Sequence, residues 1–258
     1  MGAIPNWIEQ GQGDQALVFL HGIGGNATSF DAQLPAFADN WRAIAWDMPG
    51  YGATPLEGEM TWSALSEAML RLLDHLEIER AVVVGHSMGG MVAQDLALDH
   101  PDRVRATVLS ATSVAFGSAD GSFQERFLAE RLAPLDAGLT PADLAPKVMP
   151  GMFKDYASEA AIARAVASMS GIPSESYRAA LHCLVTFNRR DDTSRIACPT
   201  LVLAAEKDET APPRGMERMA AKIPEARYHC IPGAGHLANL ERPDAFNAAI
   251  GDFLETLP

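Results

Sequence analysis

Short apolar runs recur along the chain, and each is closed by turn residues. Because the runs are continuous and rich in β-branched residues, they predict strands that are buried on both faces, as in a parallel sheet. The runs cover residues 16–20, 43–46, 81–84, 104–109, 201–205 and 228–231.

The segments between these runs have helical periodicity. Residues 62–76 place Leu65, Met69 and Leu72 on one side of a helix, whereas residues 88–98 are apolar almost all round, which is typical of a buried helix. Residues 213–223 and 243–257 each open with proline, which favours the first turn of a helix. The alternation of strands and helices predicts an α/β fold with a doubly wound, mostly parallel sheet.

Residues 113–195 interrupt this alternation. They contain no convincing strand and instead show helical patches at 123–132, 141–149, 158–169 and 174–187, separated by proline and glycine. A helical insertion between two parallel strands is expected to cover the carboxyl ends of the sheet, where open α/β sheets bind ligands. The sequence therefore predicts a core made of residues 1–112 and 196–258, with residues 113–195 as a cap.

Charge and cysteine content narrow the possible partners and compartment. The formal net charge is −13, so the chain should repel nucleic acid and anionic membrane surfaces. The three cysteines are odd in number and form no CxxC pair, which indicates free thiols in a cytoplasmic protein. We see no signal peptide and no membrane-spanning run. We expect a small-molecule substrate and a monomer or homodimer.

The most informative motif is G-x-S-x-G at residues 85–89. It stands directly after a buried strand and directly before an apolar helix. A nucleophilic serine must project from a sharp strand-to-helix turn, and glycines two residues away on either side relieve the crowding that this turn creates. The motif makes Ser87 the candidate nucleophile. The alternative is a structural serine in a tight turn.

A second glycine-rich segment, HGIGG at residues 21–25, follows the first buried strand. It predicts an oxyanion hole formed by the backbone amides of Ile23 and Met88, the residue after the nucleophile. The alternatives are a plain glycine-rich turn or a phosphate loop, but neither the Walker nor the Rossmann spacing is present. We expect His21 to hold this loop by hydrogen bonds.

The candidate base and acid also follow strands. His236 lies in a short loop after the last strand, and Asp208 lies in the turn after the strand before it. The chain order Ser87, Asp208, His236 is that of a nucleophile elbow with its triad partners. We expect His86 to pack beside the nucleophile, and His182 in the cap is a candidate substrate contact. Glu206 and Glu209 are alternative acids, which we expect to be solvated.

The whole chain resembles the α/β-hydrolase superfamily with a helical cap. The matching segments are HGIGG (21–25), WDMPGYG (46–52), GHSMGGMVAQ (85–94), HPDRV (100–104), PTLVLAAEKD (199–208) and GAGHLANLERPDAF (233–246). Within the superfamily the chain is most similar to 3-oxoadipate enol-lactonase-like proteins, through FNRRD (187–191) and residues 224–243. The resemblance implies hydrolysis without cofactor or metal, through an acyl-enzyme at Ser87.

Three functions stay open at this point. The first is hydrolysis of a small carboxylic ester or lactone. The second is hydrolysis of a carbon–carbon bond of the meta-cleavage-product type by the same triad, and the third is ligand binding without catalysis. An enol-lactone with a free carboxylate would need a cationic anchor. The candidates are the cap arginines Arg126, Arg131, Arg178, Arg189 and Arg190. The segment before the first core strand has room for only one strand.

Overall fold

The computed structural model describes residues 2–257 and is built on a seven-stranded sheet with the strand order β1-β3-β2-β4-β5-β6-β7. β1 pairs with β3 in antiparallel fashion, and every other neighbouring pair is parallel, as the sequence predicts for most of the sheet. The strands are β1 (Trp7–Gln10), β2 (Ala16–Leu20), β3 (Arg42–Trp46), β4 (Ala81–His86), β5 (Val104–Ser110), β6 (Thr200–Ala205) and β7 (Arg227–Ile231).

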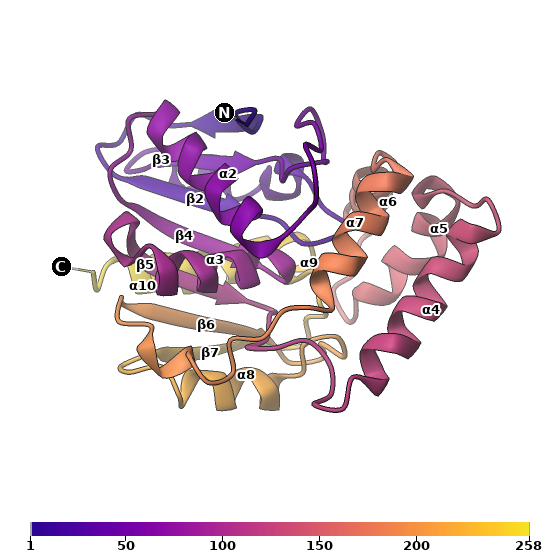
Figure 1. The fold of residues 1–258 in the computed structure, drawn as a ribbon. Coiled ribbons are helices and arrows are strands. Elements are labelled where there is room, and N and C mark those ends of the chain that lie inside the picture. Colours follow the sequence, from indigo (N-terminus) through magenta and orange to yellow (C-terminus); the bar gives the residue numbers. More distant parts are fainter. Residues whose placement is uncertain (1, 258) are drawn as a thin grey trace.

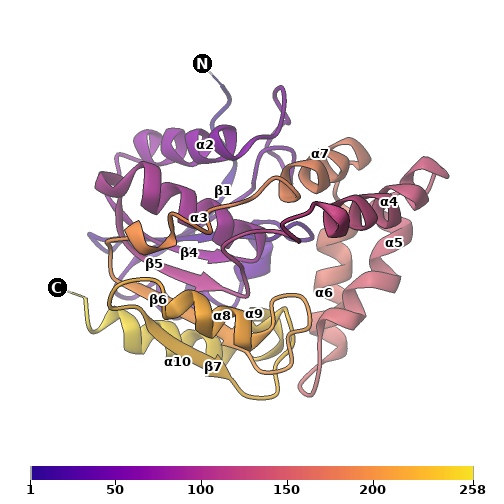
Figure 2. The same cartoon turned by 60° about the horizontal axis from the view of Figure 1, so that its bottom comes forward.

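Both faces of the sheet are covered by helices, which explains why the strand sequences do not alternate between apolar and polar. Val18 and Val83 pack on the face covered by α2 (Trp62–His75), α3 (Met88–Asp99) and α8 (Pro213–Ala220). The next residue along each of these strands, Phe19 in β2 and Val84 in β4, packs on the opposite face. That face is covered by α1 (Leu34–Phe37) and α10 (Pro243–Leu254). Figure 2 shows α2 and α3 on one side of the sheet and α10 on the other.

Helix ends differ from the sequence prediction mainly at the C-terminal side. α8 and α10 end three residues before the predicted positions, at Ala220 and Leu254. α1 and α9 (Ala238–Glu241) were not predicted because four residues cannot display a helical period. Within residues 2–257, no helix is long and apolar enough to cross a membrane. The 3₁₀ turns are η1 (Ala27–Phe30), η2 (Pro101–Arg103), η3 (Met149–Met152) and η4 (Thr193–Arg195).

Four helices between β5 and β6 lie together beyond one end of the sheet (Figure 1). They are α4 (Ser122–Asp136), α5 (Pro141–Val148), α6 (Glu159–Ser170) and α7 (Ser174–Leu184), and we call them the cap helices. α4 continues past Leu132, where its pattern was predicted to end. Pro134 lies in the last turn, so its missing N–H removes only one hydrogen bond from the helix.

The chain enters and leaves the cap side by side. Phe116 N–H donates to Phe187 O at 2.9 Å, and Arg189 N–H donates to Val114 O at 2.7 Å. The guanidinium of Arg189 then binds the carboxylates of Asp95, at 2.6 Å, and Asp99 on α3. Salt bridges therefore connect the segment that leaves the cap to α3, the helix that begins next to Ser87.

The cysteines are free thiols that contribute to packing. Cys183 is buried in α7, and burial raises the pKa of its thiol to about 12, so it stays protonated at neutral pH. Burial also raises the pKa of Cys198 and of Cys230. These shifts make all three poor nucleophiles.

We expect Arg189→Met to destabilise the protein by ~2 kcal/mol, because it leaves the Asp95 carboxylate without its partner. That carboxylate is only 3% exposed, whereas Arg189 is 25% exposed, so the cost should fall below that of a fully buried pair. Urea unfolding at pH 7 measures the loss. Arg190→Met is the control, since Arg190 is exposed and forms no ion pair with any residue in the range 2–257. Equal stability of the two variants would contradict the assignment.

Candidate active site

Ser87 occupies a strained turn between β4 and α3. Its backbone has φ 53° and ψ −118°, a left-handed conformation that is unfavourable for a residue with a side chain. A Cβ atom on Gly85 would lie 2.3 Å from Gly89 O, and one on Gly89 would lie 2.2 Å from Leu20 O. The two glycines of the G-x-S-x-G motif are therefore required by backbone contacts, as the motif predicts.

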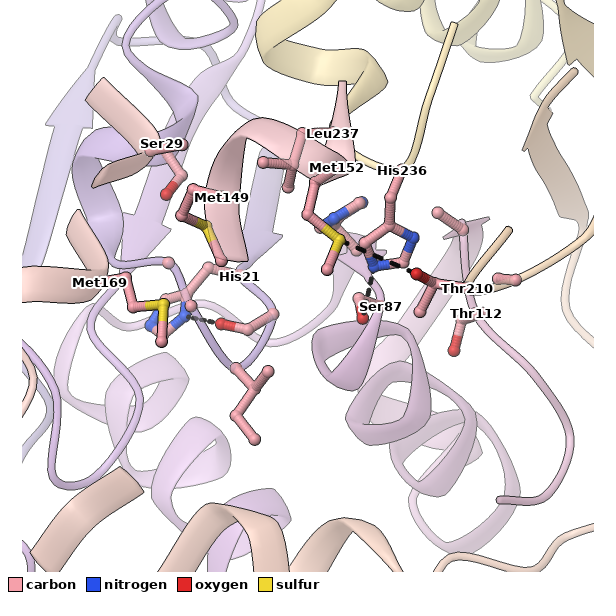
Figure 3. A pocket seen from close by; sticks show the side chains of 18 of the residues that line it. His21, Ser29, Ser87, Thr112, Met149, Met152, Met169, Thr210, His236 and Leu237 are labelled. Carbon is pink, nitrogen blue, oxygen red and sulfur yellow. Dashed lines mark hydrogen bonds between the residues drawn. The ribbon is translucent and has the colours of Figure 1, made fainter. Parts of the chain in front are cut away.

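A continuous hydrogen-bonded chain joins three of the predicted residues. His236 Nε2 lies 3.1 Å from Ser87 Oγ, and His236 Nδ1 lies 2.8 Å from Asp208 Oδ2. Figure 3 shows the imidazole above the serine hydroxyl at the edge of the cavity. The residues come from the loops after β4, β6 and β7, which meet because parallel strands have their carboxyl ends at one edge of the sheet.

The carboxylate of Asp208 is buried but well supplied with donors. Its second oxygen, Oδ1, accepts hydrogen bonds from the amides of Thr210 at 2.7 Å and Ala211 at 2.9 Å. Burial pushes the pKa of Asp208 up, but the hydrogen bond and charge of His236 and these two amides outweigh it. The net pKa lies below the usual value, so Asp208 is ionised at neutral pH and holds the Nδ1–H tautomer of His236.

The predicted oxyanion loop is fixed by its neighbours. Gly22 O accepts hydrogen bonds from His21 Nδ1 at 2.8 Å and from Gly25 N–H at 3.0 Å. This oxygen belongs to the same planar peptide as the Ile23 amide, so the two bonds also fix the direction of the Ile23 N–H. A Cβ atom on Gly22 would lie 2.9 Å from Ser87 Cβ, which places this peptide against the serine.

The second predicted donor, the amide of Met88, is the first residue of α3. An amide in the first turn of a helix has no intrahelical acceptor, and the helix dipole adds positive potential there. Both amides are thus placed beside Ser87. Their role in stabilising an oxyanion stays a prediction.

Two buried histidines next to this centre are neutral. Met48 N–H donates to His21 Nε2 at 3.0 Å, so the proton of His21 is on Nδ1, and burial lowers its pKa to about 4. Burial and the neighbouring His236 lower the pKa of His86 to about 3. His21 holds the loop by hydrogen bonds, as predicted. His86 packs with its ring 5.1 Å from that of His236 and lines the cavity.

The space above Ser87 is a mostly apolar cavity between the sheet edge and the cap helices. The cap supplies Met149, Met152 and Met169. Figure 3 shows Met152 beside His236, and Met149 and Met169 on the side of Ser29 and His21. The prediction that His182 contacts substrate is wrong. α7 turns Leu181 and Leu184 toward the cavity, and His182, one residue further round the helix, is exposed to solvent.

The structure also separates the five cap arginines. Arg131 lines the cavity, whereas Arg126 and Arg190 are exposed on the surface. Arg178 binds Asp136, and Arg189 binds acids of α3. Arg131 is therefore the cap arginine that the cavity presents to a ligand.

Glu241 is a structural residue of the site that the sequence reasoning missed. Its buried carboxyl group accepts hydrogen bonds from the cap amides of Lys154 at 2.8 Å and Tyr156 at 3.0 Å, and from Gly235 at 2.7 Å. Gly235 precedes His236, so Glu241 joins the cap to the histidine loop. Its partners are backbone amides, and any residue type can supply a backbone amide. The sequence around Glu241 therefore gives no signal of these contacts.

Glu206 and Glu209, the two alternatives to Asp208, are not part of the triad. Glu206 and Glu209 are exposed, as predicted, although Glu206 also accepts a hydrogen bond from Gly233 N–H at 2.7 Å. Glu209 binds Lys154. Within residues 2–257, no group of three or more His, Cys, Asp or Glu side chains is arranged to hold a metal ion.

Comparison with known proteins decides the family. The family model for the alpha/beta hydrolase fold matches residues 15–243. The chain belongs to this α/β-hydrolase family. This α/β hydrolase is 29% identical to 3-oxoadipate enol-lactonase 2 of Acinetobacter baylyi, over 95% of this chain and 91% of that protein. It is 32% identical to a Caulobacter sp. protein provisionally named carbamate hydrolase RutD, over 93% of this chain and 90% of that protein.

Solved structures agree with this assignment. The enol-lactonase from Burkholderia xenovorans LB400 superposes with a TM-score of 0.85 at 26% identity, covering 97% of this chain and 96% of that one. Other relatives of this α/β hydrolase are named as a methyl ester esterase and, provisionally, as a non-heme bromoperoxidase. Members of this family are therefore named for several different activities.

We expect Glu241→Gln to lower the thermal unfolding midpoint, since a carboxamide has one acceptor oxygen and cannot serve amides on both sides. Leaving a buried amide without a partner costs ~1–3 kcal/mol. Amide hydrogen exchange should accelerate at Gly235 and at Lys154 and Tyr156. Glu217→Gln, an exposed substitution with the same charge change, is the control. Unchanged exchange at these amides would contradict the proposed joint.

Proposed function

We propose that this α/β hydrolase cleaves small carboxylic esters or lactones through an acyl-enzyme formed at Ser87. The observation that carries the proposal is the unbroken path from Asp208 through His236 to Ser87 Oγ, with distances of 2.8 and 3.1 Å, at the wall of an apolar cavity. These are the contacts that a hydroxyl needs to lose its proton as it attacks a carbonyl carbon.

The first half of the reaction forms the acyl-enzyme. Ser87 Oγ attacks the carbonyl carbon while His236 Nε2 takes the hydroxyl proton, and the carbonyl oxygen becomes negatively charged. The amides of Ile23 and Met88 donate to that oxygen, and Asp208 stabilises the imidazolium. The carbon–oxygen bond to the leaving group then breaks, and His236 returns the proton to the leaving alkoxide.

The second half releases the acid. A water molecule gives its proton to His236 Nε2 and attacks the acyl carbon, and the tetrahedral intermediate collapses to free Ser87 Oγ, which recovers the proton. In a lactone, the leaving alkoxide stays attached to the acyl group, so the single product is a hydroxy acid. An enol leaving group would become a ketone after release.

The cavity supports small, partly apolar substrates. Methionine side chains are flexible and polarisable, and the cap places Met149, Met152 and Met169 on the wall of the cavity. The enol-lactonase and esterase names among relatives favour carboxylic esters and lactones over other acyl groups.

The backbone of Ser87 argues for catalysis over binding alone. A left-handed serine costs ~1–3 kcal/mol, and such strain persists where the surroundings hold it in place for a purpose. A binding protein would have no need of a hydroxyl in this conformation, aligned with a histidine and a buried acid. No contact in the site selects carbon–carbon cleavage over ester cleavage.

The test is hydrolysis of p-nitrophenyl acetate by the wild type, Ser87→Ala and the control Ser63→Ala, an exposed serine on α2. We expect Ser87→Ala to reduce kcat/KM by ~10³-fold or more. A phosphonate probe should add to the peptide that contains Ser87. Equal rates in the wild type and Ser87→Ala would overturn the proposal. Turnover of a ring-fission dienoate without ester turnover would favour carbon–carbon cleavage.

The acid limb of the pH profile should report a single ionisation. His236 must be neutral to accept a proton, whereas His21 and His86, with pKa values lowered to about 4 and about 3, remain neutral above pH 5. Asp208, with its lowered pKa, remains ionised there. Because these three groups keep one protonation state above pH 5, we expect log(kcat/KM) to fall there with a slope no steeper than one as the pH decreases. A slope of two above pH 5 would contradict this assignment.

A further inference from the structure

The wall of the cavity is almost free of charge. Of the Asp, Glu, Lys and Arg side chains in residues 2–257, only that of Arg131 lines it. Two of the three histidines on the wall, His21 and His86, are kept neutral by burial. Arg131 is therefore the one fixed charge that a bound molecule meets from this wall, in an apolar setting that strengthens electrostatic interactions.

Arg131 has no acidic partner among the described residues. The other arginines that the cap uses structurally are each paired. Arg164 binds Asp31, Arg178 binds Asp136, and Arg189 binds Asp95 and Asp99. A half-buried guanidinium without a carboxylate leaves its N–H donors available, and burying a charge without a partner is unfavourable.

The guanidinium is held in place by aromatic neighbours. Phe127 and Arg131 are four residues apart on α4, and the Arg131 Cζ atom lies 5.5 Å from the centre of the Phe127 ring. Phe116 packs on Phe127 at 4.8 Å, and both rings line the cavity. α4 packs on α7. Tyr177 of α7 also lines the cavity and interacts electrostatically with Arg131.

We propose that Arg131 binds a carboxylate on the substrate, so that the preferred esters or lactones carry a free carboxylate at a distance from the bond that is cleaved. The inference rests on the proposed function and adds the class of substrate. A guanidinium presents two parallel N–H groups to a carboxylate, and among residues 2–257 no other Lys or Arg side chain lines this cavity, in a chain whose net charge is −13.

A carboxylate fits this wall better than a phosphate. A phosphate monoester carries nearly two charges at neutral pH, and one guanidinium would leave about one of them uncompensated in an apolar cavity. A carboxylate carries one charge, which Arg131 balances. If the free carboxylate is on the acyl part, or if the substrate is a lactone, the product carries two carboxylates; if it is on the leaving group of an ester, the acid and the alcohol carry one each. The reaction that supplies the substrate must therefore form an ester or lactone while one carboxyl group stays free.

The test uses two matched pairs of esters. p-Nitrophenyl hydrogen adipate and p-nitrophenyl 6-methylheptanoate place a carboxylate or an isopropyl group at the end of the acyl chain. 4-Carboxyphenyl acetate and 4-isopropylphenyl acetate do the same on the leaving group. The measured quantity is the ratio of kcat/KM for the anionic ester to that for its neutral partner, in the wild type and in variants.

We expect Arg131→Met to lower this ratio by about ten- to hundredfold in at least one pair, the range for a hydrogen-bonded charge. Arg131→Lys should recover part of the ratio, since it keeps the charge but loses the paired donors. The control is Arg126→Met, which removes the same charge from an exposed position on the same helix. The ratio for the wild type should also fall as salt is added.

The outcomes separate this inference from the proposed function. If Arg131→Met leaves the ratio unchanged in both pairs, or changes it no more than Arg126→Met does, the carboxylate site is wrong while Ser87-dependent hydrolysis can still stand. If no ester of either pair is hydrolysed in a Ser87-dependent manner, the proposed function itself fails. In that case binding of adipate to the wild type and to Arg131→Met, measured by calorimetry, decides whether Arg131 recognises a carboxylate.

Discussion

The turn at Ser87 is the constraint on which the neighbouring structure depends. A side chain in the left-handed region is stable only if the atoms around it leave no other choice. Backbone oxygens of Leu20 and Gly89 lie so close that residues 85 and 89 must be glycine. The peptide at Gly22 lies against Ser87 Cβ from the other side. Close packing of three loops thus keeps one hydroxyl raised above the end of the sheet.

Much of this arrangement follows from the sequence because it depends on chain direction. Parallel strands that are buried on both faces produce continuous apolar runs, and their carboxyl ends meet at one edge. The residues that follow such runs, Ser87, Asp208 and His236, must therefore come close together, as the measured distances show. The short antiparallel β1 also matches the single strand for which the N-terminal segment has room.

The sequence did not predict which side chains of the cap face the cavity. Its helices bury one side against the cavity and another against each other, so periodicity alone does not identify the side that meets a ligand. His182 was assigned to the wrong side for this reason, and sequence could not distinguish Arg131 from the other cap arginines. Glu241 was missed because its partners are backbone amides, two of them more than 80 residues away in the chain.

The joint made by Glu241 has a mechanical consequence. The carboxyl group holds the chain between η3 and α6 and, through Gly235, the peptide that carries the imidazole of His236. If residues 154–156 moved away from the sheet, they would pull the Gly235 peptide with them and displace the imidazole of His236 from the hydroxyl of Ser87. The hydrogen bonds of Glu241 therefore keep the distance between the His236 loop and this part of the cap fixed, and with it the position of the imidazole above Ser87.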